Sequence, residues 1–343
     1  MAIQQGQQAL ASDFVSTSGG TNDAGKVPKL NSSGKIDNSF MTVKFGGNGS
    51  DGSLSISSGT TSINLGGASV VVKNYTSISI TGTGKLAFTN PNANGTFVIL
   101  KSQGDVTLTS SSAPMIDCRN TGGGGGASAA GSIGTLSYIT GNSGHSAQIS
   151  SLQTNAGEGG WVHNPAVGGA IPTVFGISAN IFSFILSKFN FLTFAGAGGG
   201  AGGVSTGNAG SFNGNTAAGG TGGGALLIEC GGAWNFTTAG GISVAGSAGS
   251  NGNSGGGGNT TVAGGGGGGG GFGLALYNTL VANSGTFLCA GGTGGTASMS
   301  SGGAAFGGAG GGSVFNSGAN GGYYNGGAGG NGFSLIAPNT EFI

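Results

Sequence analysis

Residues 264–271 are eight consecutive glycines, the extreme case of a composition with 85 glycines in 343 residues. Glycine loses the most backbone entropy on ordering and brings no side chain to bury, so such a chain folds only if its backbone amides hydrogen-bond to one another in bulk. A disordered linker would combine high charge with low hydrophobicity. Here charged residues make up 5%, hydrophobic residues make up 36%, and mean hydropathy is +0.15. The glycines are therefore interpreted as structural.

The few charges are unevenly distributed along the chain. The formal net charge is zero, and eight of the nine basic residues precede residue 120. Beyond that point the charged side chains are Lys188, Glu158, Glu229 and Glu341. No basic stripe is present to neutralise phosphates, so a nucleic-acid partner is not expected. So little surface charge favours a component of an assembly over a freely diffusing enzyme.

Residues 1–43 are polar and show neither a helical nor a strand period. Residues 20–26 match a phosphate-binding loop up to its last position, where Val27 replaces Ser or Thr. Such a loop opens a helix, and Pro28 disfavours a helical conformation at Val27, so no nucleotide site is expected. The first residues also lack the basic and apolar regions of a secretory signal.

Residues 44–121 predict short β-strands. Apolar runs, such as residues 54–56, 78–80 and 98–100, recur at short intervals, and most alternate with Ser, Thr or Asn. Alternation with a period of two indicates half-buried strands, and Gly, Asn and Asp mark the turns between them. Regular short strands without helices fit a sandwich or a stacked solenoid. The Ser- and Thr-rich outward positions favour a β-helix.

From residue 122 onward a loose repeat is present, in which a glycine tract leads into an apolar strand, a short excursion and a second strand. Residues 222–230 with 241–249 and residues 269–277 with 285–292 are two copies, and a third begins at residue 329. Residues 95–118 resemble the same unit without its leading glycines, which predicts one continuous stack with glycine tracts inserted at its corners. Extended threefold glycine helices lying side by side can hydrogen-bond to one another because no Cβ separates them. Flexible loops are the alternative.

The fold expected from these patterns is all-β: a short-strand β-helix or solenoid-like stack with inserted glycine tracts packed as polyglycine II helices. Three regions are expected: an attachment linker (1–43), a β-solenoid region (44–121) and a glycine-rich repeat and tip region (122–343). The apolar stretch 174–194 is long enough to span a membrane, but Lys188 and the partial alternation of its aromatic residues favour buried strands.

Few residues suggest chemistry. Cys118, Cys230 and Cys289 each end a short apolar run, which favours buried free thiols over a three-thiolate metal site that lacks a fourth ligand. Asp117 and Glu229 each precede a cysteine at matching places in the repeat. Stacking could pair them as in a glycoside hydrolase, or each could be an outward strand position. No nucleophile elbow and no HExxH motif is present. We expect no cofactor and no enzymatic activity.

Two parts of the sequence resemble known proteins. Residues 23–40 (Asp-Ala-Gly-Lys-Val-Pro-Lys-Leu-Asn-Ser-Ser-Gly-Lys-Ile-Asp-Asn-Ser-Phe) look like the linker near the start of many bacteriophage tail-fibre chains. The glycine tracts, separated by variable segments rich in Asn, Ser and Tyr, resemble the glycine-rich receptor-binding tip adhesins of T-even-type phages.

The resemblance implies a polyglycine scaffold whose loops contact a receptor on the host cell. The implied partners are a host cell-surface receptor, protein or glycan, and other tail-fibre or baseplate proteins; a homotrimer is left open. The implied location is the virion, released by host lysis without an export signal. A purely structural fibre or surface-matrix protein and a polysaccharide-degrading tail spike are alternatives. An ice-binding protein is a weaker one, because the glycine runs are irregular.

Receptor contacts are expected on segments between the glycine tracts, because recognition residues concentrate in loops on rigid scaffolds. The candidates there are Phe212, Asn213, Asn251, Asn253, Tyr323, Tyr324 and Asn325. Adjacent tyrosines in a glycine setting are not expected both to face a core, although both rings could instead pack over the glycines as a lid. Trp161 and His163 could hold a sugar by stacking and hydrogen bonding, or the tryptophan could simply cap a loop.

Overall fold

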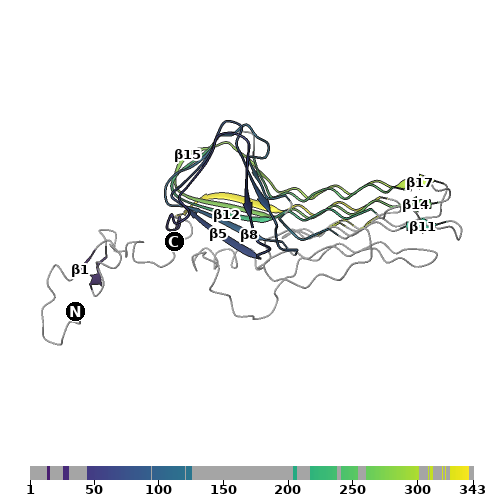
Figure 1. Ribbon diagram of the computed structural model, residues 1–343, viewed down its shortest axis with the longest axis horizontal. Helices are drawn as coiled ribbons and strands as arrows, with labels where there is room; N and C mark the ends of the chain where they lie inside the picture. Colours follow the sequence, from purple (N-terminus) through teal and green to yellow (C-terminus); the bar gives the residue numbers. More distant parts are fainter. Residues whose placement is uncertain are drawn as a thin grey trace, which may run out of the picture.

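The computed structural model describes residues 14–15, 26–30, 45–93, 95–119, 121–125, 204–206, 217–237, 241–253, 260–300, 308, 310–311, 319, 321 and 325–339. These residues form β-strands and no α-helix. Most strands belong to two parallel sheets, one of eight strands and one of five, and glycine-rich tracts project from them to one side (Figure 1).

The eight-stranded sheet contains β3 (Ser53–Ile56), β5 (Val70–Tyr75), β6 (Ser77–Ile80), β8 (Phe97–Ser102), β9 (Val106–Leu108), β12 (Ala225–Phe236), β15 (Phe272–Asn283) and β18 (Phe333–Pro338). The five-stranded sheet contains β4 (Thr60–Asn64), β7 (Lys85–Thr89), β10 (Ile116–Asp117), β13 (Ile242–Ser243) and β16 (Phe287–Leu288). A small parallel sheet joins β1 (Phe14–Val15) to β2 (Val27–Pro28). A small antiparallel sheet joins β11 (Val204–Thr206), β14 (Thr260–Val262) and β17 (Ser298–Ser300).

The chain runs through the two large sheets repeatedly, and each pass adds strands beside those of the previous pass. Strands that pair with one another from pass to pass form three columns. Column A consists of β5, β8, the first halves of β12 and β15, and β18. Column B consists of β3, β6, β9 and the second halves of β12 and β15. Column C is the five-stranded sheet. The parallel register is kept between passes, because a slip of one residue would turn every apolar side chain to the opposite face.

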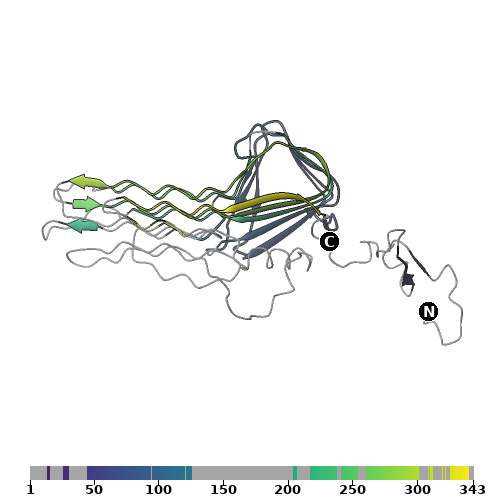
Figure 2. The ribbon, with the colours of Figure 1, turned by 180° about the vertical axis from the view of Figure 1, so that it is seen from behind.

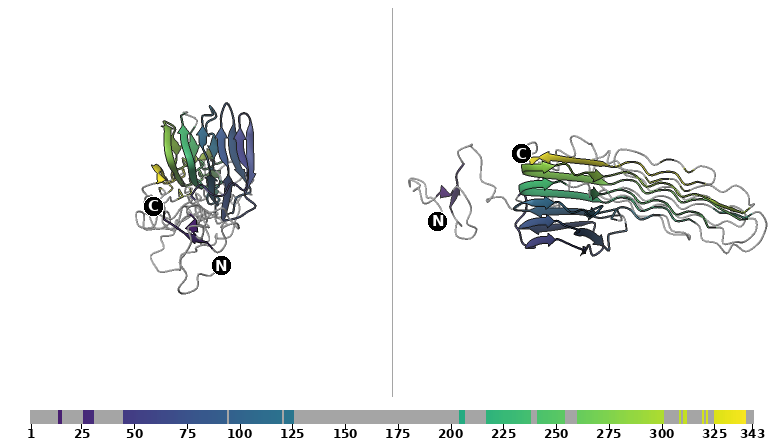
Figure 3. Two further views of the ribbon diagram at one scale, coloured as in Figure 1. Left: turned by 90° about the vertical axis from the view of Figure 1, so that its left-hand side faces the viewer. Right: turned by 90° about the horizontal axis from the view of Figure 1, so that it is seen from above.

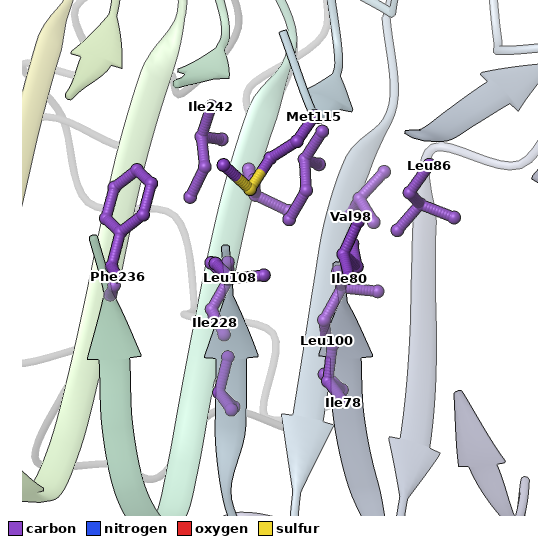
Figure 4. Close-up of a cluster of buried hydrophobic side chains, with 14 of the residues drawn as sticks. Ile78, Ile80, Leu86, Val98, Leu100, Leu108, Met115, Ile228, Phe236 and Ile242 are labelled. Carbon is purple, nitrogen blue, oxygen red and sulfur yellow. The ribbon is translucent and has the colours of Figure 1, made fainter. Parts of the chain in front are cut away.

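The core lies between columns A and B on one side and column C on the other. Alternate residues of the strands point into it, so that Ile78, Val106 and Trp234 follow one another in register. Figure 4 shows Ile80, Leu108 and Phe236 from the same strands converging with Met115 and Ile242. The rings of Trp234 and Phe236 also meet edge to face, with centroids 5.9 Å apart.

Column A is apolar on its second face as well. Phe97, Ile99, Leu227 and Phe272 form a separate buried cluster there, which explains why β8 is a continuous apolar run rather than an alternating one.

A buried ion pair lies on this second face. Lys101 and Glu229 stand opposite each other in β8 and β12, and Lys101 Nζ donates to Glu229 Oε2 over 2.9 Å. The Gly46 amide donates to the same oxygen (3.1 Å) from a turn with φ of +79°.

The predicted short-strand β-helix, with glycine tracts at its corners, is wrong. The strands form two parallel sheets, and the coil is not closed. β12 and β15 are each 12 residues long, and the chain leaves the sheets through glycine tracts after Cys118, Val244 and Cys289. Tracts 217–224, 264–271 and 325–332 run directly into β12, β15 and β18, so they continue strands rather than turn corners. A glycine tract pairs best with another glycine tract, because only there can backbones approach without Cβ atoms between them. The tracts therefore gather outside the sheets.

We call the assembled tracts the glycine array. It contains residues 217–224, 244–253, 264–271, 290–297, 308, 310–311 and 325–332, and its tracts lie side by side (Figures 1 and 3). The sheet of β11, β14 and β17 lies at its far end, and β1 and β2 lie beyond the opposite side of the large sheets (Figure 2).

Candidate binding surface

The central tract of the array, residues 264–271, is hydrogen-bonded to five neighbouring segments of the described chain. Its amides at Gly265, Gly268 and Gly271 donate to the tract 244–253, and those at Gly267 and Gly270 donate to 325–332. Its carbonyl groups accept from residues 220 and 223, 292 and 295, and 308 and 311. Partners recur at every third residue, as a threefold extended backbone requires.

These surroundings explain the run of eight glycines. A Cβ on Gly267 would lie against the carbonyl oxygen of Gly292, and one on Gly268 would lie against that of Thr221. At six of the eight positions (264, 265, 267, 268, 270 and 271), a Cβ would lie against a backbone oxygen of a neighbouring segment, so these positions have no room for a side chain.

Each outer tract faces solvent on one side only, and its sequence places a side chain on that side at every third position. In residues 290–297, Gly291 faces the carbonyl of Gly329 and Gly292 faces that of Ser247, whereas Ala290, Thr293 and Thr296 are exposed. The pattern Ala-Gly-Gly-Thr-Gly-Gly-Thr thus places each side chain at the solvent-facing third position. Residues 325–331 repeat it as Asn-Gly-Gly-Ala-Gly-Gly-Asn.

Three outer tracts together form one exposed surface. The tract 290–297 lies between 244–253 and 325–332: the amides of Gly246, Gly249 and Gly252 donate to it from one side, and those of Gly326, Gly329 and Gly332 donate from the other, the last to Cys289. We call this surface the array face. The exposed residues that recur at every third position of these tracts, and that make up the face, are Ala248, Asn251, Ala290, Thr293, Thr296, Asn325, Ala328 and Asn331.

Asparagine side chains link the tracts across the array face. Asn251 Oδ1 accepts from the amide of Thr296 (2.8 Å), and Asn325 Oδ1 accepts from that of Ala297 (3.3 Å). Asn331 Oδ1 accepts from Gly291 in the same way (3.0 Å). The predicted contact residues Asn251 and Asn325 are thus brought together, one on each side of Thr296, near the distal end of the array. Asn253 is exposed two residues further along.

The array face is uncharged. Its eight residues are Ala, Thr and Asn, and the described ion pairs all lie in or beside the large sheets. The face offers methyl, hydroxyl and carboxamide groups at regular intervals on a backbone fixed by hydrogen bonds. It can therefore bind by shape and non-ionic hydrogen bonds.

The candidate acid pair does not form. Asp117 belongs to column C, where it accepts from Lys85 Nζ (2.7 Å) and from Arg119 Nε (2.8 Å). Burial alone would raise the pKa of Asp117, but the hydrogen bonds from Arg119 and Lys85 outweigh it and hold the pKa well below its usual value.

Glu229 belongs to column A, shares no partner with Asp117, and is 1% exposed, so it is not an outward strand position. Burial raises its pKa despite the opposing charge of Lys101 and the hydrogen bonds it accepts. Because Glu229 pairs with Lys101 in one sheet and Asp117 pairs with Lys85 and Arg119 at the other, neither acid is placed to act with the other.

The cysteines are free thiols, buried at Cys118 and Cys230 and half-buried at Cys289. Burial raises the pKa of Cys118, and it raises that of Cys230 to about 11, so both stay protonated at neutral pH. Within the described residues, no three His, Cys, Asp or Glu side chains gather as metal ligands. The same part of the chain holds no helix long and apolar enough to cross a membrane.

The remaining predicted contact residues lie outside the described part of the chain: Phe212, Asn213, Trp161, His163, Tyr323 and Tyr324. The apolar stretch 174–194 lies outside it too. The predicted contact residues did not include four others that lie on the array face: Thr293, Thr296, Ala328 and Asn331. The spacing of single non-glycine residues by two glycines was the signal that could have found them.

No family model matches the chain, and comparisons with curated proteins and with solved structures find no match. Its function must therefore be inferred from its own sequence and surface.

Proposed function

We propose that this protein is an adhesin of the bacteriophage tail-fibre type, which binds a host cell-surface receptor through the array face. The observation that carries the proposal is the array itself. It is a projecting, hydrogen-bonded scaffold that keeps one uncharged face exposed, with Asn251, Thr296 and Asn325 in a row near its distal end.

The layout suits a molecule attached at one end and binding at the other. The sheet of β11, β14 and β17 at the far end of the array and the small sheet of β1 and β2 lie on opposite sides of the large sheets (Figure 2). In the proposal, the segment around β1 and β2 joins the chain to other tail-fibre or baseplate proteins of the virion. The array then reaches outward to the cell.

The chemistry of the face suits a receptor recognised without charge. Backbone positions are fixed before binding, so little conformational entropy is lost on contact. Thr hydroxyls and Asn amides supply adaptable hydrogen bonds to either a glycan or a protein. Because no ionic contact is involved, we expect binding to change little with salt concentration.

The test is binding of the fluorescently labelled full-length protein to a panel of intact bacterial cells. In the strain that binds best, Thr293→Arg should weaken binding by about tenfold or more, because a long charged side chain disrupts a neutral contact. Thr89→Arg, an exposed change at the end of β7, should leave binding unchanged. Periodate or protease treatment of the cells then distinguishes a glycan receptor from a protein.

Equal binding by Thr293→Arg and the unmodified protein would move the site away from the array face. Failure of the unmodified protein to bind any strain would instead favour the alternative of a purely structural fibre.

A further inference from the structure

The columns of the two large sheets end unevenly. Among the described strands, the first pass supplies only β3 in column B and β4 in column C. The last pass supplies only β18 in column A, because β18 pairs with residues 272–277 of β15 and goes no further. Within the described residues, one end of the sheets therefore shows no column A strand beside β3 and β4, and the other end shows no strand of column B or C beside β18.

The second end leaves apolar side chains uncovered. Leu280 is 51% exposed, Val281 63% and Leu288 47%. Leu280 lies opposite Trp234 and so continues an interior row, yet no strand among the described residues covers it on the other side. An unpaired strand edge bearing exposed apolar residues is a typical site of protein association.

The edges of columns B and C lack the residues that normally block strand addition, whereas Lys73 and Pro338 lie in the column A edge strands β5 and β18. Residues 53–64 and 278–288 contain no charged residue and no proline, whereas natural edge strands commonly use lysine or proline to prevent pairing. Residues 46–49, the described residues shortly before β3, do not cover the first edge either. Gly46 lies beside Ser102 and Gly231, and Gly49 lies beside Gln103, so this segment runs along the side of the sheets.

We propose that a second copy of the chain adds to the open end of columns B and C. Its β3 would pair in parallel with residues 279–283 of β15, and its β4 with β16. Together, β18 of one copy and β3 and β4 of the next complete one full pass. Leu54 of the added copy would then continue the interior row over Leu280.

This contact is heterologous, because it joins one end of a copy to the opposite end of the next. It therefore repeats into a linear assembly. The glycine arrays project sideways from the direction in which the strands stack (Figure 3), so they would stand along the side of that assembly.

The experiment is sedimentation velocity of the full-length protein over a range of concentrations. We expect the mass of the unmodified protein to grow with concentration. Leu280→Lys, at the last edge, and Thr61→Lys, at the first edge, should each remain single copies, with Val281→Lys as a second variant should Leu280→Lys fail to fold. Thr89→Lys lies at neither edge and should assemble normally. Circular dichroism verifies that each variant is folded.

Mixing the two edge variants gives the sharpest outcome. Leu280→Lys keeps an intact first edge and Thr61→Lys keeps an intact last edge, so the mixture should form a one-to-one dimer that grows no further. A single-copy mass for the unmodified protein at every concentration would overturn the proposal, as would a mixture that stays monomeric. Self-association of Thr61→Lys alone would show that like ends meet, and would overturn it as well.

Discussion

At Gly267 a hydrogen atom stands where any other residue would place a Cβ against the carbonyl oxygen of Gly292. Gly267→Val should therefore force two tracts apart and lower the free energy of unfolding by about 1–3 kcal/mol, the range of an overpacked core. Ala328→Val is the matched control, because residue 328 lies in the same array but faces solvent. Thermal unfolding compares the two. Equal melting temperatures would mean that the central tract does not need glycine.

Asp117 gives a prediction that depends on pH. Its pKa lies below the ordinary value of 3.8, so the folded chain binds this proton more weakly than the unfolded chain does. The contacts of ionised Asp117 with Lys85 and Arg119 therefore stabilise the fold at pH values above 3.8, and this stabilisation is lost as the pH falls below 3.8. Asp117→Asn should reduce the loss of unfolding free energy between roughly pH 6 and pH 3. Chemical denaturation at both pH values measures it, and an unchanged loss would contradict the role of the Lys85 and Arg119 contacts.

At the scale of the element, the position of each side chain along an outer tract matters more than its identity. Exchanging residues 292 and 293 (Gly292→Thr with Thr293→Gly) keeps composition and length but turns the side chain against the carbonyl of Ser247. We expect a loss of about 1–3 kcal/mol in unfolding free energy. Thr293→Gly alone, which removes only an exposed side chain, should lose less than the exchange. If the exchange is no worse than that control, the threefold arrangement of the tract is wrong.

The sequence predicts where the strands lie along the chain better than it predicts which strands pair with one another. The runs at residues 54–56, 78–80 and 98–100 lie in β3, β6 and β8, because alternation and β-branched content depend on local neighbours. The arrangement of those strands depends on contacts far apart in the chain. The repeat shows a glycine tract leading into each apolar strand, but no local pattern shows whether that tract turns a corner or extends away from the sheets. The predicted β-helix with glycine tracts at its corners is therefore wrong.

At the scale of the whole molecule, glycine content separates two parts with different chemistry. Apolar side chains hold the large sheets together, whereas backbone hydrogen bonds hold the array together. Asn251 and Asn325 could be chosen from the sequence as polar residues near glycine tracts. Thr293 and Thr296 lie inside a tract, where their spacing by two glycines indicates only that they share one side of it. The neighbouring tracts decide that this side faces solvent.

If the glycine tracts form one ordered, hydrogen-bonded array, the amides inside it are protected from solvent. Amide hydrogen exchange of residues 264–271 in the full-length protein at neutral pH measures this protection. The amides of Gly265, Gly267, Gly268, Gly270 and Gly271 all donate to neighbouring tracts. We predict that this segment exchanges as slowly as residues 226–228 in β12, whereas exchange at the rate of an unstructured glycine peptide would contradict the array.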